Sequence, residues 1–151
     1  MLVWRLTKPE HAPGLDGEGA RLWGGRWNPP GNAMVYTASS LALAALEYFV
    51  HLPPISRQTG RMSPLVAVGL QVPPECVTLF DLASLPQNYG IPDFRDAGRL
   101  WSMAQTSLGL AVPSQVISRE NNILLNPRHP DMAQVVIEVT EDFAFDDRLG
   151  V

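Results

Sequence analysis

One carboxylate stands out because its sequence neighbours are almost all apolar. Glu47 lies in the run LALAALEYFV at residues 41–50, and it is the only Asp, Glu, Lys or Arg between Trp27 and Ser56. A carboxylate in such surroundings is costly to desolvate unless an arginine, a hydroxyl or a ligand binds it. We therefore treat Glu47 as a candidate catalytic residue, with a structural ion pair or a helix edge facing water as the alternative.

A second group of residues has the chemistry of an anion and ring binder. Residues 24–31 read GGRWNPPG. Paired glycines let backbone N–H groups approach an anion, Arg26 adds a forked cation, and Trp27 offers a face for a planar ring. The alternative is an ordinary turn with a solvated arginine and a core tryptophan. Arg5, inside an otherwise apolar strand, is a further cation, and structural pairing is its alternative.

Nucleophilic and metal-dependent chemistry have weaker support. Ser114 follows Val112-Pro113 and is not part of a Gly-x-Ser-x-Gly elbow, so it is better interpreted as a hydrogen-bond donor or as a strand-end residue. The three histidines have no metal-ligand spacing with one another or with Cys76. We expect no metal site.

The elements that must position these residues are short, because glycine and proline make up 26 of 151 residues. A strand at 33–38 leads through Ser39 or Ser40, as a cap, into a helix that ends near Leu52 before two prolines. An amphipathic helix is expected from Asp93 to Leu108, with Gly109 as its stop. Strands are also expected at 2–7, 65–72, 77–80, 110–116, 122–125 and 135–140. The prediction is one α+β domain over residues 1–151, and the long segment 8–32 is expected to be a functional loop.

Composition narrows the function classes. The apolar runs are too short for a membrane span, and one cysteine allows no internal disulfide, so we expect a soluble protein of the cytoplasm. A net charge of −4 argues against a nucleic-acid partner. Residues 1–61, however, carry six cations against four acids, and ten of the eleven cations of the chain are arginine. Arginine suits bidentate phosphate contacts, so a small anionic ligand fits the first half of the chain. An arginine-rich codon usage would give the same bias.

Taken together, the ordered blocks resemble the RES-domain family, which is named for an arginine, a glutamate and a serine. The similarity spans residues 4–130, and its pieces are WR at 4–5, GGRWN at 24–28, VYTA at 35–38, AALE at 44–47, VPS at 112–114, and E-x-NILLNP-x-HP at 120–130. Residues 52–64 and 82–108 have no counterpart in it.

The resemblance implies an ADP-ribosyltransferase-like fold whose short strands surround a cleft for NAD, which is consumed as a substrate without a metal. The three signature positions fall on Arg26, Glu47 and Ser114. Further NAD contacts are implied for Arg5, Trp27, Tyr36, Asn122 and, again, Arg26 and Ser114. Family members are typically toxins of bacterial toxin–antitoxin pairs, so an Xre-type antitoxin partner is implied as well.

The chemistry fits these residue types. Cleavage of the nicotinamide–ribose bond passes through an oxocarbenium-like state, and a carboxylate such as Glu47 stabilises the developing charge. Arg26, with Arg5, would hold the diphosphate, Tyr36 or Trp27 would stack on a ring, and Ser114 would position the nicotinamide ribose or its amide. The expected function is transfer of ADP-ribose to water or phosphate. Mono-ADP-ribosylation of a protein and non-catalytic binding of a nucleotide or antitoxin are the alternatives.

Overall fold

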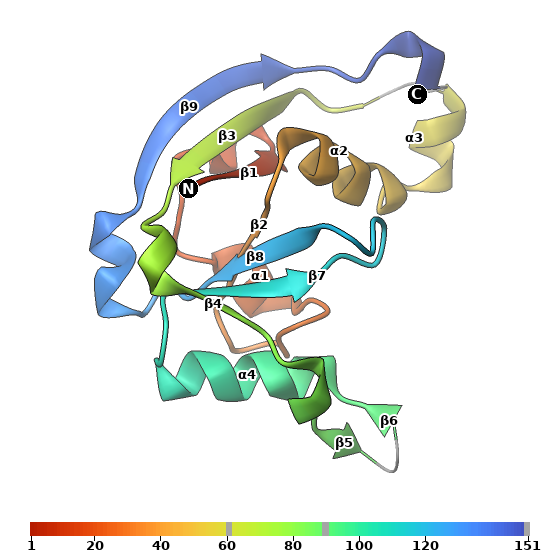
Figure 1. The fold of residues 1–151 in the computed structure, drawn as a ribbon. Coiled ribbons are helices and arrows are strands. Elements are labelled where there is room, and N and C mark those ends of the chain that lie inside the picture. Colours follow the sequence, from red (N-terminus) through yellow and green to blue (C-terminus); the bar gives the residue numbers. More distant parts are fainter. Residues whose placement is uncertain (60–61, 89–90, 150–151) are drawn as a thin grey trace.

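The structure, a computed structural model, describes residues 1–59, 62–88 and 91–149. Its main element is a seven-stranded sheet in the order β4-β7-β8-β2-β1-β3-β9 (Figure 1). All neighbouring strands run antiparallel except β4 and β7, which are parallel. These strands are β1 (Leu2–Thr7), β2 (Val35–Ala38), β3 (Leu65–Gln71), β4 (Val77–Leu79), β7 (Gly109–Pro113), β8 (Asn121–Leu125) and β9 (Val136–Phe143).

Helices and a small hairpin complete an α+β fold, as the sequence predicts. The hairpin pairs β5 (Gln87–Asn88) with β6 (Ile91–Pro92). The α-helices are α1 (Glu18–Trp23), α2 (Leu41–Val50), α3 (Pro54–Thr59) and α4 (Phe94–Ala104). Single 3-10 turns lie at Pro9–His11, Pro74–Cys76, Leu82–Ser84, Pro130–Gln134 and Asp147–Leu149. No helix in the described ranges has the length and apolar composition needed to cross a membrane.

The core divides between the two faces of the β7–β8 pair, because successive strand residues point to opposite faces. One face carries Leu110, Val112 and Leu124, which pack with Trp101 and Ala97 of α4. The other face contributes to a larger cluster with β1 and β3, of which Ala111, Ile123, Leu125, Val3 and Val68 are members. Figure 1 shows α4 on the side of β7 away from α2.

Helix α2 forms where the cap and proline signals predict it, and it packs on β1 and β2. The Ser40 side chain accepts a 3.1 Å hydrogen bond from the Leu43 N–H, which satisfies one free donor of the first turn. The helical spacing of Leu43, Leu46 and Val50 would place all three on one face of α2, but the three differ in burial. Only Leu43 is buried, whereas Leu46 and Val50 are 40% and 44% exposed. The run is apolar on all sides, so periodicity could not select the packed face.

Helix α4 also begins where predicted, since Asp93 accepts a 2.9 Å hydrogen bond from the Asp96 N–H. Its predicted stop at Gly109 is wrong. The helix ends at Ala104 because Gln105 takes a left-handed conformation with φ of 50°, and Ala104 is exposed. Leu108 is buried, but it leads into β7 rather than belonging to the helical stripe.

The segment 8–32, predicted to be a loop, is partly helical, because α1 and the 3-10 turn at Pro9–His11 lie within it. Gly17 and Gly24 flank α1 with φ of 67° and 71°, a backbone conformation that favours glycine. A Cβ on Gly17 would lie 2.6 Å from the Met34 nitrogen, so a larger residue does not fit there. These two glycines set the turns at the two ends of α1.

Candidate active site

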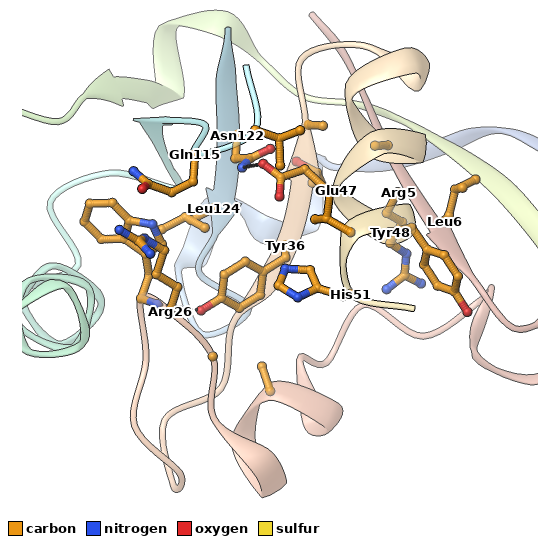
Figure 2. Close-up of a pocket in the computed structure, with 18 of the residues that line it drawn as sticks. Arg5, Leu6, Arg26, Tyr36, Glu47, Tyr48, His51, Gln115, Asn122 and Leu124 are labelled. Atoms are coloured by element: carbon orange, nitrogen blue, oxygen red, sulfur yellow. Dashed lines mark hydrogen bonds between the residues drawn. The ribbon is translucent and has the colours of Figure 1, made fainter. Parts of the chain in front are cut away.

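A cavity of about 610 Å³ lies where β1, α1, β2, α2 and the β7–β8 connection meet. Its size is typical of a site for a small molecule or cofactor. Figure 2 shows Glu47 and Asn122 close together, Tyr36 and His51 in the middle, and Arg26 and Arg5 on opposite sides of the view. Residues far apart in the sequence therefore share one cavity, although Ser114 itself lies behind its wall, 2% exposed.

Glu47 is held by one of its two carboxylate oxygens. Its Oε1 accepts a 2.8 Å hydrogen bond from the Ser114 hydroxyl and a 2.6 Å hydrogen bond from the Asn122 side-chain amide. Oε2 accepts no hydrogen bond from any residue that the structure describes. The half-buried carboxylate thus has a fixed orientation and one oxygen free for a ligand.

Ser114 acts on this carboxylate rather than on the cavity. Its Oγ donates to Glu47 and accepts hydrogen bonds from the N–H groups of Val116 and Ile117, both at 3.0 Å. A hydroxyl has one proton and two acceptor positions, so this one is fully used. Ser114 is therefore a positioning residue, and the expected contact between its hydroxyl and a ligand finds no support in the geometry.

Arg5 has a structural task that the sequence does not reveal. Its Nη2 donates to the carbonyls of His11, Ala12 and Gly14 at 2.9, 3.0 and 2.6 Å. Its Nε is buried without a hydrogen-bond partner in the described structure. Burial lowers the pKa of the guanidinium, and the nearby charge of Asp16 opposes this shift. Arg5 lines the cavity, but one end of its guanidinium fastens residues 11–14 to β1.

Arg26 is the more available cation. Its side chain is exposed, and its guanidinium carbon lies 4.3 Å from the centroid of the Phe94 ring. Arg26 forms no hydrogen bond or ion pair with the described residues, so its N–H donors are open to a ligand. A planar guanidinium whose N–H donors are free is suited to binding phosphate oxygens.

The two aromatic candidates differ in position. Trp27 is 4% exposed, and its ring packs edge-on against Phe80 and Phe94 at 5.0 and 5.1 Å. Trp27 contributes to the cavity lining, but most of its ring belongs to the core, so little of the ring is open for stacking on a ligand. Tyr36 lines the cavity with its ring, and its hydroxyl donates to Asn28 Oδ1 at 2.6 Å.

The Tyr36 hydroxyl is engaged in hydrogen bonds within the protein, so we assign it no contact with a substrate. Besides donating to Asn28, it accepts a 3.0 Å hydrogen bond from the Trp27 N–H. Burial raises its pKa to about 12, so the group is neutral at physiological pH. A Cβ on Gly25 would lie 2.5 Å from this hydroxyl, which explains the second glycine of the GGRWN segment.

Among the polar residues that line the cavity, the sequence analysis did not single out Tyr48, His51 or Gln115. His51 follows Glu47 by four positions, and residues at this spacing share one face of a helix. The sequence therefore contained a sign that His51 lies on the same side of the helix as Glu47. Gln115 directly follows Ser114. Among the residues that the structure describes, no three histidine, cysteine or carboxylate side chains are grouped as metal ligands would be.

Comparison with known proteins now identifies the family. The family model described as the RES domain matches residues 2–146. The chain belongs to the RES-domain family.

Curated relatives match this RES domain along nearly its whole length. A protein named Toxin Res from Photorhabdus laumondii is 32% identical, with 99% of this chain and 97% of the relative covered. Another Toxin Res, from Yersinia enterocolitica, is 34% identical with 99% of each chain covered. A protein named Prs ADP-ribosylating toxin, from a Sphingobium strain, is 35% identical, with 97% and 94% covered.

The fold of the RES domain is also found in a solved structure. A chain from the crystal structure of the M. tuberculosis MbcT–MbcA toxin–antitoxin complex superimposes with a TM-score of 0.67. The alignment covers 94% of this chain and 83% of that chain at 20% sequence identity. This similarity supports the α+β fold independently of the family model.

Proposed function

We propose that this RES domain is a toxin that cleaves the nicotinamide–ribose bond of NAD and transfers ADP-ribose to water or phosphate. The observation that carries the proposal is Glu47, whose carboxylate is fixed through Oε1 and free at Oε2 inside a cavity of cofactor size. The names of the relatives, two called Toxin Res and one called ADP-ribosylating toxin, support the toxin role and the class of chemistry.

The reaction needs no acid to activate its leaving group. The bond between ribose C1 and the pyridinium nitrogen breaks, and its electron pair neutralises the positive charge of the nicotinamide. A water or phosphate oxygen then bonds to C1, and water releases one proton as the bond forms. The positive charge that develops on the ribose in between is what a nearby carboxylate stabilises.

Six residues in and beside the cavity take definite roles in this scheme. The free Oε2 of Glu47 bonds a ribose hydroxyl and faces the developing charge. Arg26 binds the diphosphate through its unused donors, and the Tyr36 ring packs against a planar ring of NAD. Ser114 and Asn122 hold Glu47 in place. Arg5 adds positive charge to the cavity and fastens residues 11–14 to β1.

A second candidate function is supported by a specific relative. The Sphingobium protein is named an ADP-ribosylating toxin, so the acceptor of ADP-ribose in this chain can also be a side chain of another protein. The same Glu47 and Arg26 would then serve, since only the nucleophile differs. The non-catalytic alternative, in which the cavity merely holds a nucleotide or a peptide, makes the fixed carboxylate unnecessary.

We also propose an antitoxin partner. The solved structure with the same fold is a toxin–antitoxin complex, and the family resemblance implies a partner of the Xre type. A cation-bearing cavity mouth in a protein of net charge −4 offers a local attraction for a carboxylate-bearing segment.

The products distinguish these possibilities. Purified protein is incubated with NAD labelled in the adenylate, with and without phosphate, and with and without cell extract. The proposal expects free ADP-ribose in water and ADP-ribose 1-phosphate when phosphate is the acceptor. Label on a protein band, without release of small products, would favour the second candidate. Growth arrest that survives both Arg26→Ala and Glu47→Gln would favour the non-catalytic alternative.

A further inference from the structure

The loop that carries Arg26 is held by the start of α4, a region that has no counterpart among the family motifs. The Arg95 Nε donates a 2.9 Å hydrogen bond to the Gly25 carbonyl, and the Phe94 ring lies under the Arg26 guanidinium, 4.3 Å from its central carbon. One turn later, Gly98 lets α4 approach the loop so closely that a Cβ there would lie 1.8 Å from the Trp27 carbonyl oxygen. Three successive loop residues therefore contact α4.

The Phe94 ring restrains Arg26 without neutralising its charge. An arginine side chain has many rotamers, and a group that contacts the guanidinium reduces this freedom. Arg26 has no acidic partner among the described residues, and its guanidinium lies over the Phe94 ring. An acidic partner would neutralise the charge and occupy the N–H donors. An aromatic face restrains the guanidinium and leaves its edge donors free.

We propose that Phe94 is a positioning residue that presents the Arg26 guanidinium to the diphosphate of NAD. The inference rests on the proposed function for its substrate, but the restraint of Arg26 by the ring is a property of the free protein. Loss of the ring should therefore weaken substrate binding and leave the chemical step unchanged.

A second phenylalanine provides a matched control. Phe80 and Phe94 are both half-buried, and both pack edge-on against Trp27, at 5.0 and 5.1 Å and at 76° and 74°. Only Phe94 contacts Arg26. Replacing either ring with leucine removes the same kind of core contact, so the difference between the two variants isolates the effect on Arg26.

The kinetic test compares Phe94→Leu, Phe80→Leu and Phe94→Tyr. We expect Phe94→Leu to raise KM for NAD by ~2- to 5-fold relative to Phe80→Leu, with kcat unchanged, because an exposed cation–π contact has about this strength. Phe94→Tyr keeps the aromatic face and should restore KM. In an Arg26→Gln background, Phe94→Leu should have no further effect on KM. Equal KM values for the two leucine variants, or a loss in kcat alone, would overturn the proposal.

A readout that does not depend on NAD separates this inference from the proposed function. The Arg26 Nε–Hε signal in ¹⁵N NMR, identified by its loss in Arg26→Gln, should be shifted upfield by the ring current in the wild type and in Phe80→Leu. The shift should disappear in Phe94→Leu and return in Phe94→Tyr. An unchanged signal in Phe94→Leu contradicts the inference. If the signal behaves as expected but the wild type leaves NAD intact, the restraint of Arg26 is upheld and the proposed reaction fails.

Discussion

At the scale of single residues, the site contains one candidate catalytic carboxylate that two other side chains hold in place. Ser114 and Asn122 both bind the same oxygen of Glu47, at 2.8 and 2.6 Å. Two donors on one oxygen fix the carboxylate plane and direct Oε2 as the remaining acceptor. The serine of the three signature residues therefore contributes through the glutamate.

Removing this support should reduce the rate less than removing the carboxylate itself. We expect Ser114→Ala to lower kcat for NAD cleavage, though less than Glu47→Gln does, and to lower the free energy of unfolding by about 1–3 kcal/mol because two N–H groups lose their acceptor. The matched control is Ser102→Ala, another buried serine, whose hydroxyl contacts Asn32 and the Arg99 carbonyl. It should lose stability with kcat intact; equal kcat values in both variants would contradict the positioning role.

The ring and the hydroxyl of Tyr36 have separable tasks. Tyr36→Phe removes the bonds to Asn28 and the Trp27 N–H, so the variant should be about 1–3 kcal/mol less stable while KM for NAD stays near that of the wild type. Tyr36→Leu removes the ring and should raise KM. A large rise in KM for Tyr36→Phe would show that the hydroxyl binds substrate.

The raised pKa of Tyr36 predicts an alkaline limit of stability. Its value of about 12 exceeds the ordinary 10.0, so the folded protein keeps the proton that the unfolded chain loses in this range. The resulting stabilisation is present below pH 10 and is lost as pH rises to 12. In urea titrations over this interval, the wild type should lose unfolding free energy more steeply than Tyr36→Phe. Parallel pH profiles would rule out this contribution.

At the scale of elements, α4 stabilises the loop that carries the arginine of the site. The approach of α4 depends on Gly98, where a Cβ would overlap the Trp27 carbonyl oxygen. Gly98→Ala should therefore cost about 1–3 kcal/mol or more, as overpacking does. Gly19→Ala is the control, because a Cβ at this helical position in α1 meets no atom within 4 Å. It should be neutral or stabilising by about 0.5–1 kcal/mol. Equal chemical-denaturation midpoints for the two variants would contradict the close packing of α4.

The helices and strands also show which structural features local sequence patterns can predict. Side chains that act within a few residues were predictable: Ser40 and Asp93 cap their helices as expected. Contacts that arise only when distant segments meet were not. Nothing near Trp27 in the sequence indicates that Phe80 and Phe94 pack against its ring. The α2 run, apolar apart from Glu47 and the Tyr48 hydroxyl, offered no reason to expect Leu46 and Val50 at the surface.

At the scale of the whole molecule, the strand order explains how the site forms. β2 lies between β1 and β8 in the sheet, so Arg5, Tyr36 and Asn122 come from three adjacent strands although more than a hundred residues separate the first from the last. α2 follows β2 directly and packs on β1 and β2, which places Glu47 beside Asn122. The sequence predicted most of these elements, but their order in the sheet depends on non-local pairing, such as the parallel β4–β7 pair, that no local pattern reports.

The family match and the fold agree with the resemblance drawn from the sequence, whereas the reaction depends on what the cavity does to NAD. In the proposed reaction, a single fixed carboxylate stabilises the charge formed when nicotinamide leaves. Glu47→Gln keeps the side-chain shape and removes the negative charge. Glu138→Gln makes the same change at an exposed position of β9 and serves as the control.

The most direct measurement is the rate of nicotinamide release from NAD by purified wild type, Glu47→Gln and Glu138→Gln, with equal folding verified by circular dichroism. We expect release by the wild type and Glu138→Gln at the same rate, and a fall of roughly 10²- to 10³-fold for Glu47→Gln, comparable to the loss of one electrostatic stabiliser in other active sites. Equal rates for Glu47→Gln and the wild type, or no release by the wild type in the presence of water, phosphate or cell extract, would contradict the proposed reaction.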